Sequence, residues 1–104
     1  MEGILIRYDY AGDGQVWERA IRRFLDSVDA DKRLQGSFSY MVSRVEEGPG
    51  RVHLGRWDSD ATLEHLKAQP FFAEFGAAVK GFGGDTLDVT DLLPFAQTHP
   101  LETD

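Results

Sequence analysis

Residues 51–82 read RVHLGRWDSDATLEHLKAQPFFAEFGAAVKGF, and this stretch decides the fold. Its first residues, up to Trp57, are typical of a β-strand. The Asp-Ser-Asp run that follows offers side-chain oxygens and negative charge for the start of a helix. Pro70 cannot lie inside a regular helix, so it either kinks this helix or begins a second one. Apolar residues keep helical spacing beyond it, until a glycine-rich run ends the helix.

The residues before this stretch predict two more strands and a helix. Residues 4–10 are rich in β-branched and aromatic side chains, which predicts the first strand. Residues 16–28 carry apolar side chains at helical spacing, and Asp13 can cap this helix. Residues 38–45 alternate between two faces and are joined to residues 52–57 by a Gly- and Pro-containing connection. These two segments therefore predict an antiparallel hairpin.

Residues 86–93 alternate in the same way and predict a fourth strand. The predicted order is β-α-β-β-α-β, with the second helical segment interrupted. This order is typical of the ferredoxin-like α+β fold, a four-stranded antiparallel sheet with its helices on one face. We expect one domain over residues 1–94, followed by a polar tail over residues 95–104 that is either loose or laid on a partner.

The alternation in the first strand predicts a homodimer. If the helices cover one face of the sheet, either Ile4, Ile6 and Tyr8 or the opposite face with Leu5 points away from them. A contiguous apolar face is costly in water, and a second copy is the usual remedy. We therefore expect two copies to join through their open sheet faces and form a homodimer.

The composition limits the partners and the compartment. The 104 residues carry a formal charge of −7, and the basic residues are scattered among more numerous acids, so no nucleic-acid partner is expected. Cysteine is absent, which excludes disulfides and thiolate metal sites and fits a cytoplasmic location. No apolar run is long enough for a membrane span. With His99 set aside in the tail, the other two histidines, His53 and His65, have no spaced acidic partners and predict no metal site.

The segment GRWDSDATLEHLKAQPFFAEF resembles the dimeric α/β-barrel superfamily and, within it, the antibiotic-biosynthesis-monooxygenase-like group. In that group a strand ending in an aromatic residue runs into a helix of the form W-x-[DS]-x-x-A-[LF]-x-x-H, and an aromatic helix follows. The residues that fit are Trp57, Asp58, Ser59, Leu63, Pro70 and Phe72. The same alignment places the family's helix histidine at Leu66, one residue after His65. One residue turns a side chain by about 100 degrees around a helix.

The haem-degrading branch of the superfamily relies on an asparagine, a tryptophan and an axial histidine. The corresponding positions fall near Arg7, Leu66 and Gly76, so all three groups are missing. Without an imidazole for the iron, no haem is expected. We expect no cofactor.

The resemblance implies oxygenation without a cofactor. In that chemistry the protein would have to deprotonate a phenol-like substrate, so that the resulting carbanion can react with dioxygen. Such a site needs a base, donors for the oxyanion and a dry aromatic pocket. Arg7 is the candidate for holding an anionic oxygen, and His53 or His65 is the candidate base. The candidate substrate-binding residues are Tyr8, Tyr40, Trp57, Phe71 and Phe75.

Each of these residues also has a structural interpretation. Tyr8 and Tyr40 can pack a sheet face, Trp57 can belong to the core, His53 can be a satisfied buried histidine, and His65 can lie on the surface. The alternative function is therefore a non-catalytic dimeric module, which binds a ligand or takes part in a stress response. The enzyme requires a pocket beside Trp57 into which Arg7 or a histidine points. The module predicts instead that Trp57, Phe71 and Phe75 fill that space.

Overall fold

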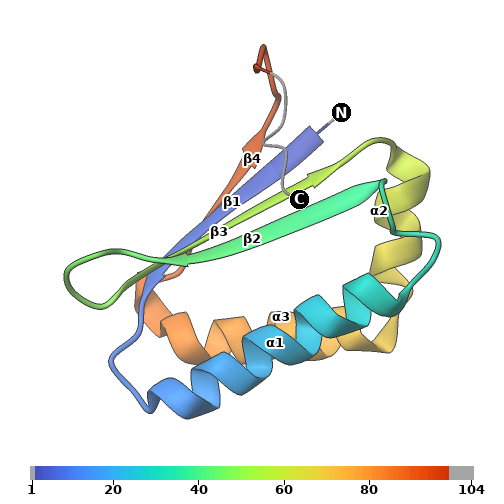
Figure 1. The fold of residues 1–104 in the computed structure, drawn as a ribbon. Helices are drawn as coiled ribbons and strands as arrows, with labels where there is room; N and C mark the ends of the chain where they lie inside the picture. Colours follow the sequence, from blue (N-terminus) through green and yellow to red (C-terminus); the bar gives the residue numbers. More distant parts are fainter. Residues whose placement is uncertain (1, 99–104) are drawn as a thin grey trace.

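The computed structural model describes residues 2–98, which form a four-stranded antiparallel sheet with three α-helices on one face (Figure 1). The elements are β1 (Glu2–Asp9), α1 (Gly14–Ala30), β2 (Phe38–Arg44), β3 (Gly50–Trp57), α2 (Asp60–Lys67), α3 (Pro70–Gly83), the short 3-10 helix η1 (Gly84–Thr86) and β4 (Asp88–Leu92). The strands lie side by side in the order β2-β3-β1-β4. The predicted ferredoxin-like α+β fold is confirmed. The last residues of the predicted tail, 99–104, lie outside the described residues.

Pro70 begins a new helix. Helix α2 ends at Lys67, and α3 starts with Pro70 in its first turn. Proline suits this position because its missing N–H would have no partner there and its φ is already helical. Of the two alternatives that the sequence leaves open, the second is the correct one. The break lets α2 close one end of the sheet while α3 runs beside α1 beneath it (Figure 1).

Helix α1 covers the middle of the sheet. Asp13 caps it, with its Oδ1 accepting hydrogen bonds from the backbone N–H of Gln15 at 2.8 Å and of Val16 at 3.4 Å. The buried stripe consists of Trp17, Ile21, Phe24 and Val28. Val16 belongs to the predicted apolar pattern, yet 44% of it is exposed, because it lies about 100 degrees around the helix from Trp17.

The fourth strand is shorter than the pattern of residues 86–93 predicts, because it begins only at Asp88. Thr86 belongs to η1, and its hydroxyl donates to the carbonyl of Gly83 at 2.7 Å. The same oxygen accepts a hydrogen bond from the backbone N–H of Asp9 at 2.9 Å. Thr86 thus joins the end of β1 to the end of α3, which withdraws it from the strand.

The register of the sheet settles which strand face meets the helices. Tyr8 is 3% exposed and belongs to the core under the helices, and Ile4 and Ile6 share its side of β1. Leu5 therefore lies on the open face, which no described helix covers (Figure 1). There, neighbouring strands pair Met41 with Leu54, and Leu54 with Leu5, so that an apolar row crosses the sheet. None of the helices within residues 2–98 is long and apolar enough to cross a membrane.

Candidate functional site

A cavity of about 510 Å³ lies between the sheet and helices α2 and α3. Six aromatic residues line it: Phe24, Phe38, Tyr40, Trp57, Phe72 and Phe75. Ile4 and Ile6 of β1 and Leu66 of α2 contribute aliphatic surface. A concave, mainly apolar cavity of this size with few polar groups is typical of a small-molecule binding site.

Four charged residues also line the cavity: Glu2, Lys67, Lys80 and Asp91. The last three are exposed, so they mark the mouth of the cavity, between β4 and the two helices. Glu2 is half-buried, and its Oε2 accepts a hydrogen bond of 3.3 Å from Nε1 of Trp57. The cavity therefore combines an aromatic interior with carboxylates and ammonium groups near its entrance.

Behind the cavity wall, four side chains form a continuous hydrogen-bonded chain. Nε1 of Trp17 donates to the hydroxyl oxygen of Tyr8 at 2.8 Å. That oxygen lies 2.9 Å from Nε2 of His53, and Nδ1 of His53 lies 2.7 Å from the hydroxyl oxygen of Tyr40. His53 is fully buried, and the chain ends at Tyr40, which is half-buried and lines the cavity.

Burial keeps the titratable members of this chain neutral. It lowers the pKa of His53 to about 4, because the charged imidazolium loses its hydration. Burial also raises the pKa of Tyr8, and this effect exceeds the opposing effect of the hydrogen bond from Trp17. The pKa of Tyr40 is raised first by burial and then by the nearby Tyr8. At neutral pH the chain therefore consists of two phenols, a neutral imidazole and an indole.

Gly55 makes room for the ring of Tyr40. It pairs with Tyr40 across β2 and β3. A Cβ at position 55 would lie 3.0 Å from Cδ1 of Tyr40 and 3.1 Å from Cγ2 of Ile4, closer than side chains normally approach. The absence of a side chain therefore lets the Tyr40 ring lie against the sheet with its hydroxyl at His53.

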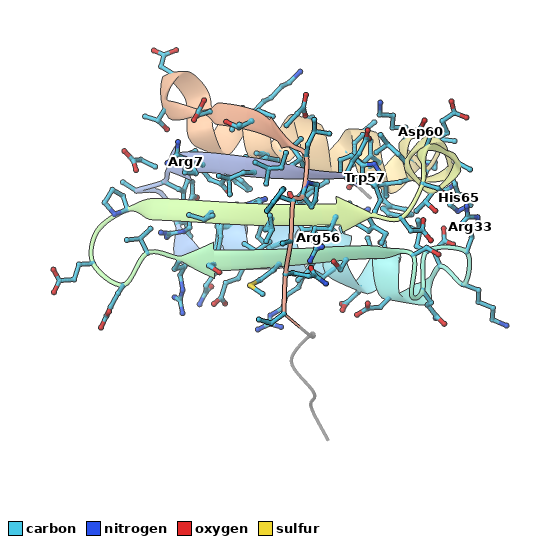
Figure 2. The ribbon with its side chains drawn as sticks, turned by 90° about the horizontal axis from the view of Figure 1, so that it is seen from above. Arg7, Arg33, Arg56, Trp57, Asp60 and His65 are labelled. Atoms are coloured by element: carbon cyan, nitrogen blue, oxygen red, sulfur yellow. The ribbon has the colours of Figure 1, made fainter. Side chains whose placement is uncertain are left out.

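The structure places the three predicted catalytic residues apart from one another. Arg7 lies on the open face and forms an ion pair of 3.1 Å with Asp88. His65 lies at the far end of the molecule from Arg7 (Figure 2), with its Nε2 2.8 Å from Oδ2 of Asp31. Neither lines the cavity. His53 is close to it but lies behind Tyr40. The catalytic roles of these three residues stay predictions.

The predicted substrate-binding residues are closer together. Tyr40, Trp57 and Phe75 line the cavity. Tyr8 lies behind them and reaches Tyr40 only through His53. Phe71 lines a separate, smaller cleft of about 170 Å³ between α1 and α3. Trp57 and Phe75 thus line the cavity and do not fill it.

On α2, the position that aligns with the family's histidine is Leu66, and it faces the cavity, whereas His65 does not. Leu66 is 1% exposed and lines the cavity, so the helix position that faces inward carries an aliphatic side chain. His65 points about 100 degrees away, toward Asp31. The imidazole nearest to the cavity is instead that of His53 on β3, which lies behind Tyr40.

None of the four charged lining residues was predicted as a site residue from the sequence. Asp91 alternates with Leu87 and Val89, so the strand pattern already placed it on the same side as two apolar residues. Glu2 precedes the predicted first strand, and only its register opposite Trp57 brings it to the cavity. Within residues 2–98, no group of three or more His, Cys, Asp and Glu side chains could hold a metal ion.

The fold and the cavity define a ferredoxin-like α+β protein with an aromatic-lined cavity between its sheet and its helices. Solved structures share this architecture. SnoaB from Streptomyces nogalater, described as a cofactor-independent oxygenase, matches with a TM-score of 0.70 at 17% identity over 96% of this chain and 97% of SnoaB. A candidate antibiotic biosynthesis monooxygenase from Caulobacter crescentus matches with a TM-score of 0.72 at 16% identity over 91% of this chain and 90% of its own.

A dimeric ferredoxin-like protein of unknown function from Jannaschia sp. CCS1 is also similar, with a TM-score of 0.66 at 18% identity over 89% of this chain and 98% of its own. No protein-family model matches the sequence, and no curated protein is significantly similar to it. The resemblance to antibiotic biosynthesis monooxygenases is therefore confirmed at the level of the fold.

Proposed function

We propose that this protein binds a small aromatic molecule in the cavity and oxygenates it without a cofactor. The observation that carries the proposal is the cavity of about 510 Å³, which aromatic side chains line and a few charged residues border. A flat ring system can pack against the aromatic lining there. The description of SnoaB as a cofactor-independent oxygenase, on the same fold, supports the choice of reaction.

The proposed reaction begins with loss of a proton from a phenol-like substrate. The carbanion then adds dioxygen to form a carbon–oxygen bond, and the resulting peroxide takes up a proton. Loss of the remaining C–H proton breaks the O–O bond, so that the carbon becomes a carbonyl and the second oxygen atom leaves as water. The substrate thereby supplies all four electrons and ends at the quinone level of oxidation. Neither Arg7 nor a histidine lines the cavity, so the expected arrangement of the base is not met. The base in this proposal is instead a carboxylate of the lining, Glu2 or Asp91. The apolar walls exclude water, which favours reaction of the carbanion with dioxygen over its reprotonation.

We also propose that two copies join through the open sheet face. The row of Met41, Leu54 and Leu5 gives that face a contiguous apolar centre, and Met41 is 61% exposed. A second copy would remove this surface from water. The description of the Jannaschia protein as dimeric supports this assembly. The resulting barrel would leave both cavities, one in each copy, on its outer sides under the helices.

A substitution that fills the cavity tests the proposed function. Gly76 lines the cavity on α3, and no atom within 4 Å would meet a Cβ there. Gly76→Leu should therefore occupy the cavity without disturbing the core. Gly81→Leu, at an exposed position of the same helix with equally open surroundings, is the matched control.

The assay follows oxygen consumption with naphthol-type and hydroxyquinone-type substrates. We expect uptake with the unmodified protein and with Gly81→Leu, and loss of uptake with Gly76→Leu. Binding of these molecules without oxygen uptake would reduce the function to ligand binding. If the aromatic panel neither binds nor raises the melting temperature, the proposal is wrong.

A further inference from the structure

The hydrogen-bonded chain from Trp17 to Tyr40 has a direction, and the direction depends on which ring nitrogen of His53 carries the proton. The hydroxyl of Tyr8 already accepts the N–H of Trp17. Its own hydrogen can go only to Nε2 of His53, because within residues 2–98 its oxygen has no other polar contact. Nε2 must then be unprotonated, and the proton of the neutral imidazole lies on Nδ1.

The opposite arrangement is less stable. If Nε2 carried the proton, Tyr8 would accept two hydrogen bonds, and its hydroxyl hydrogen would point into the core without an acceptor. Tyr8 is 3% exposed, so water cannot satisfy that hydrogen. A buried donor without a partner costs about 1–3 kcal/mol. The chain therefore runs from Trp17 to Tyr8, from Tyr8 to His53 and from His53 to Tyr40.

With this direction, the hydroxyl hydrogen of Tyr40 is the one hydrogen of the chain that has no acceptor within it. Nδ1–H of His53 donates to the oxygen of Tyr40 at 2.7 Å. The hydroxyl hydrogen of Tyr40 then cannot point to His53, and no other side chain among the described residues accepts it. Tyr40 is half-buried and lines the cavity, so a molecule in the cavity is the nearest partner to which this hydrogen can turn. Donation from His53 also strengthens Tyr40 as a donor, because hydrogen bonds in a chain polarise one another.

We propose that Tyr40 is the specificity-determining residue of the cavity. Its hydroxyl donates a hydrogen bond to a carbonyl or oxyanion oxygen of the ligand, and Trp17, Tyr8 and His53 are positioning residues that orient it. The ligand class is a flat aromatic ketone, quinone or phenolate. This inference rests on the proposed function, since it assumes that an aromatic molecule occupies the cavity.

The first test observes the tautomer directly. Nitrogen-15 NMR of histidine-labelled protein at neutral pH distinguishes Nδ1–H from Nε2–H in each imidazole. The variants His65→Gln and His99→Gln assign the signals, and the one that remains in both spectra belongs to His53. We expect His53 to carry its proton on Nδ1. A proton on Nε2 would overturn the proposal whether or not any ligand binds.

The second test compares two probes of the same shape, fluorenone with a carbonyl and fluorene without one. Tyr40→Phe removes only the hydroxyl and keeps the ring. Tyr10→Phe is the matched control, because the Tyr10 hydroxyl donates to the Asp13 carbonyl, away from the cavity. Dissociation constants from quenching of tryptophan fluorescence are measured for both probes with all three proteins.

We expect Tyr40→Phe to weaken fluorenone binding roughly two- to tenfold, the effect of losing one hydrogen bond. Fluorene binding should stay the same, and Tyr10→Phe should match the unmodified protein for both probes. Tyr8→Phe, which removes the donor to His53, should also weaken fluorenone binding while leaving fluorene binding unchanged.

Two outcomes separate this inference from the proposed function. If fluorenone binds to Tyr40→Phe as tightly as to the unmodified protein, and fluorene does so too, the cavity binds aromatic molecules and the role proposed for Tyr40 is wrong. If neither probe binds to the unmodified protein, the proposed function fails and this inference fails with it. The melting temperature of Tyr40→Phe shows whether any loss of binding comes from unfolding.

Discussion

Nε2 of His65 lies 2.8 Å from Oδ2 of Asp31, so a single side-chain contact joins helix α2 to the residue that caps the end of α1. The two residues are far apart in the sequence, and the contact holds the helix that closes one end of the cavity. The hydrogen bond from His65 also lowers the pKa of Asp31 below its usual value, because it stabilises the carboxylate.

This contact predicts a pH-dependent effect of Asp31→Asn. The pKa of Asp31 is lowered in the folded protein, so its contribution is present above its unfolded pKa of about 4 and disappears as the pH falls through the folded value. Asparagine keeps an oxygen for the backbone N–H of Arg33, which Oδ1 of Asp31 now accepts. At about pH 6 we expect Asp31→Asn to lose less than about 1 kcal/mol of unfolding free energy, because the pair is partly exposed. As the pH falls below about 4, the difference between the two proteins in urea unfolding should shrink, and it should vanish once Asp31 is protonated in the folded state. A difference that does not change with pH would contradict the effect.

Buried His53 predicts a larger acid effect. Its pKa is lowered from 6.5 to about 4 in the folded protein, so the unfolded chain binds a proton first as the pH falls. Stability therefore decreases with decreasing pH over this window. Between about pH 7.5 and pH 4.5 we expect a loss of about 2–3 kcal/mol in urea unfolding. His65→Gln, the control, should show the same loss. NMR titration of the His53 ring near its ordinary pKa would contradict this prediction.

The space around Gly55 predicts opposite effects of two Gly→Ala substitutions. Gly55→Ala brings a methyl group within 3.0 Å of the Tyr40 ring and 3.1 Å of Ile4, so we expect a loss of about 1–3 kcal/mol. Gly81→Ala adds the same methyl group in open space within α3. It should raise stability by up to about 1 kcal/mol, because alanine favours the helix. Thermal unfolding measures both, and an unchanged melting temperature for Gly55→Ala would show that Tyr40 can move aside.

The apolar row on the open face predicts the assembly. Leu54 lies at its centre between Met41 and Leu5. Leu54→Asp should convert the proposed dimer into a monomer, since a buried unpaired carboxylate is costly. Ala77→Asp, at an exposed position of α3, should leave the dimer intact. Sedimentation equilibrium at micromolar concentration distinguishes the two. A monomeric unmodified protein would contradict the proposed assembly.

Most of the fold could be predicted from the sequence, because the signals are local. Alternation defines β1 to β3, helical spacing defines α1, and Asp13 and Ser59 cap the helices as expected. The start of β4 could not be predicted, because Thr86 fits the alternation but its hydroxyl is engaged in a turn. Side chains that satisfy distant backbone groups leave no periodic signal.

The site was less predictable than the fold. Aromatic residues on the correct strand and helix faces identified Tyr40, Trp57 and Phe75 as lining residues. The partners of His53 depend on how far two tyrosines reach across neighbouring strands, which the sequence does not show. The position of Arg7 depends on which face of β1 meets the helices. The prediction left this choice open, although Leu5 is the only large apolar residue on the face that carries Arg7 and Asp9.

Because Tyr40 pairs with Gly55, the position of Tyr40 in the cavity wall depends on the register between β2 and β3. Sliding β2 by one residue would turn Tyr40 to the opposite face and bring Ser39 or Met41 under the helices. The cavity would then lose the Tyr40 hydroxyl, although the sequence of β2 would be unchanged. Mutations in the connecting turn, far from any ligand, could therefore abolish recognition through misalignment of the two strands.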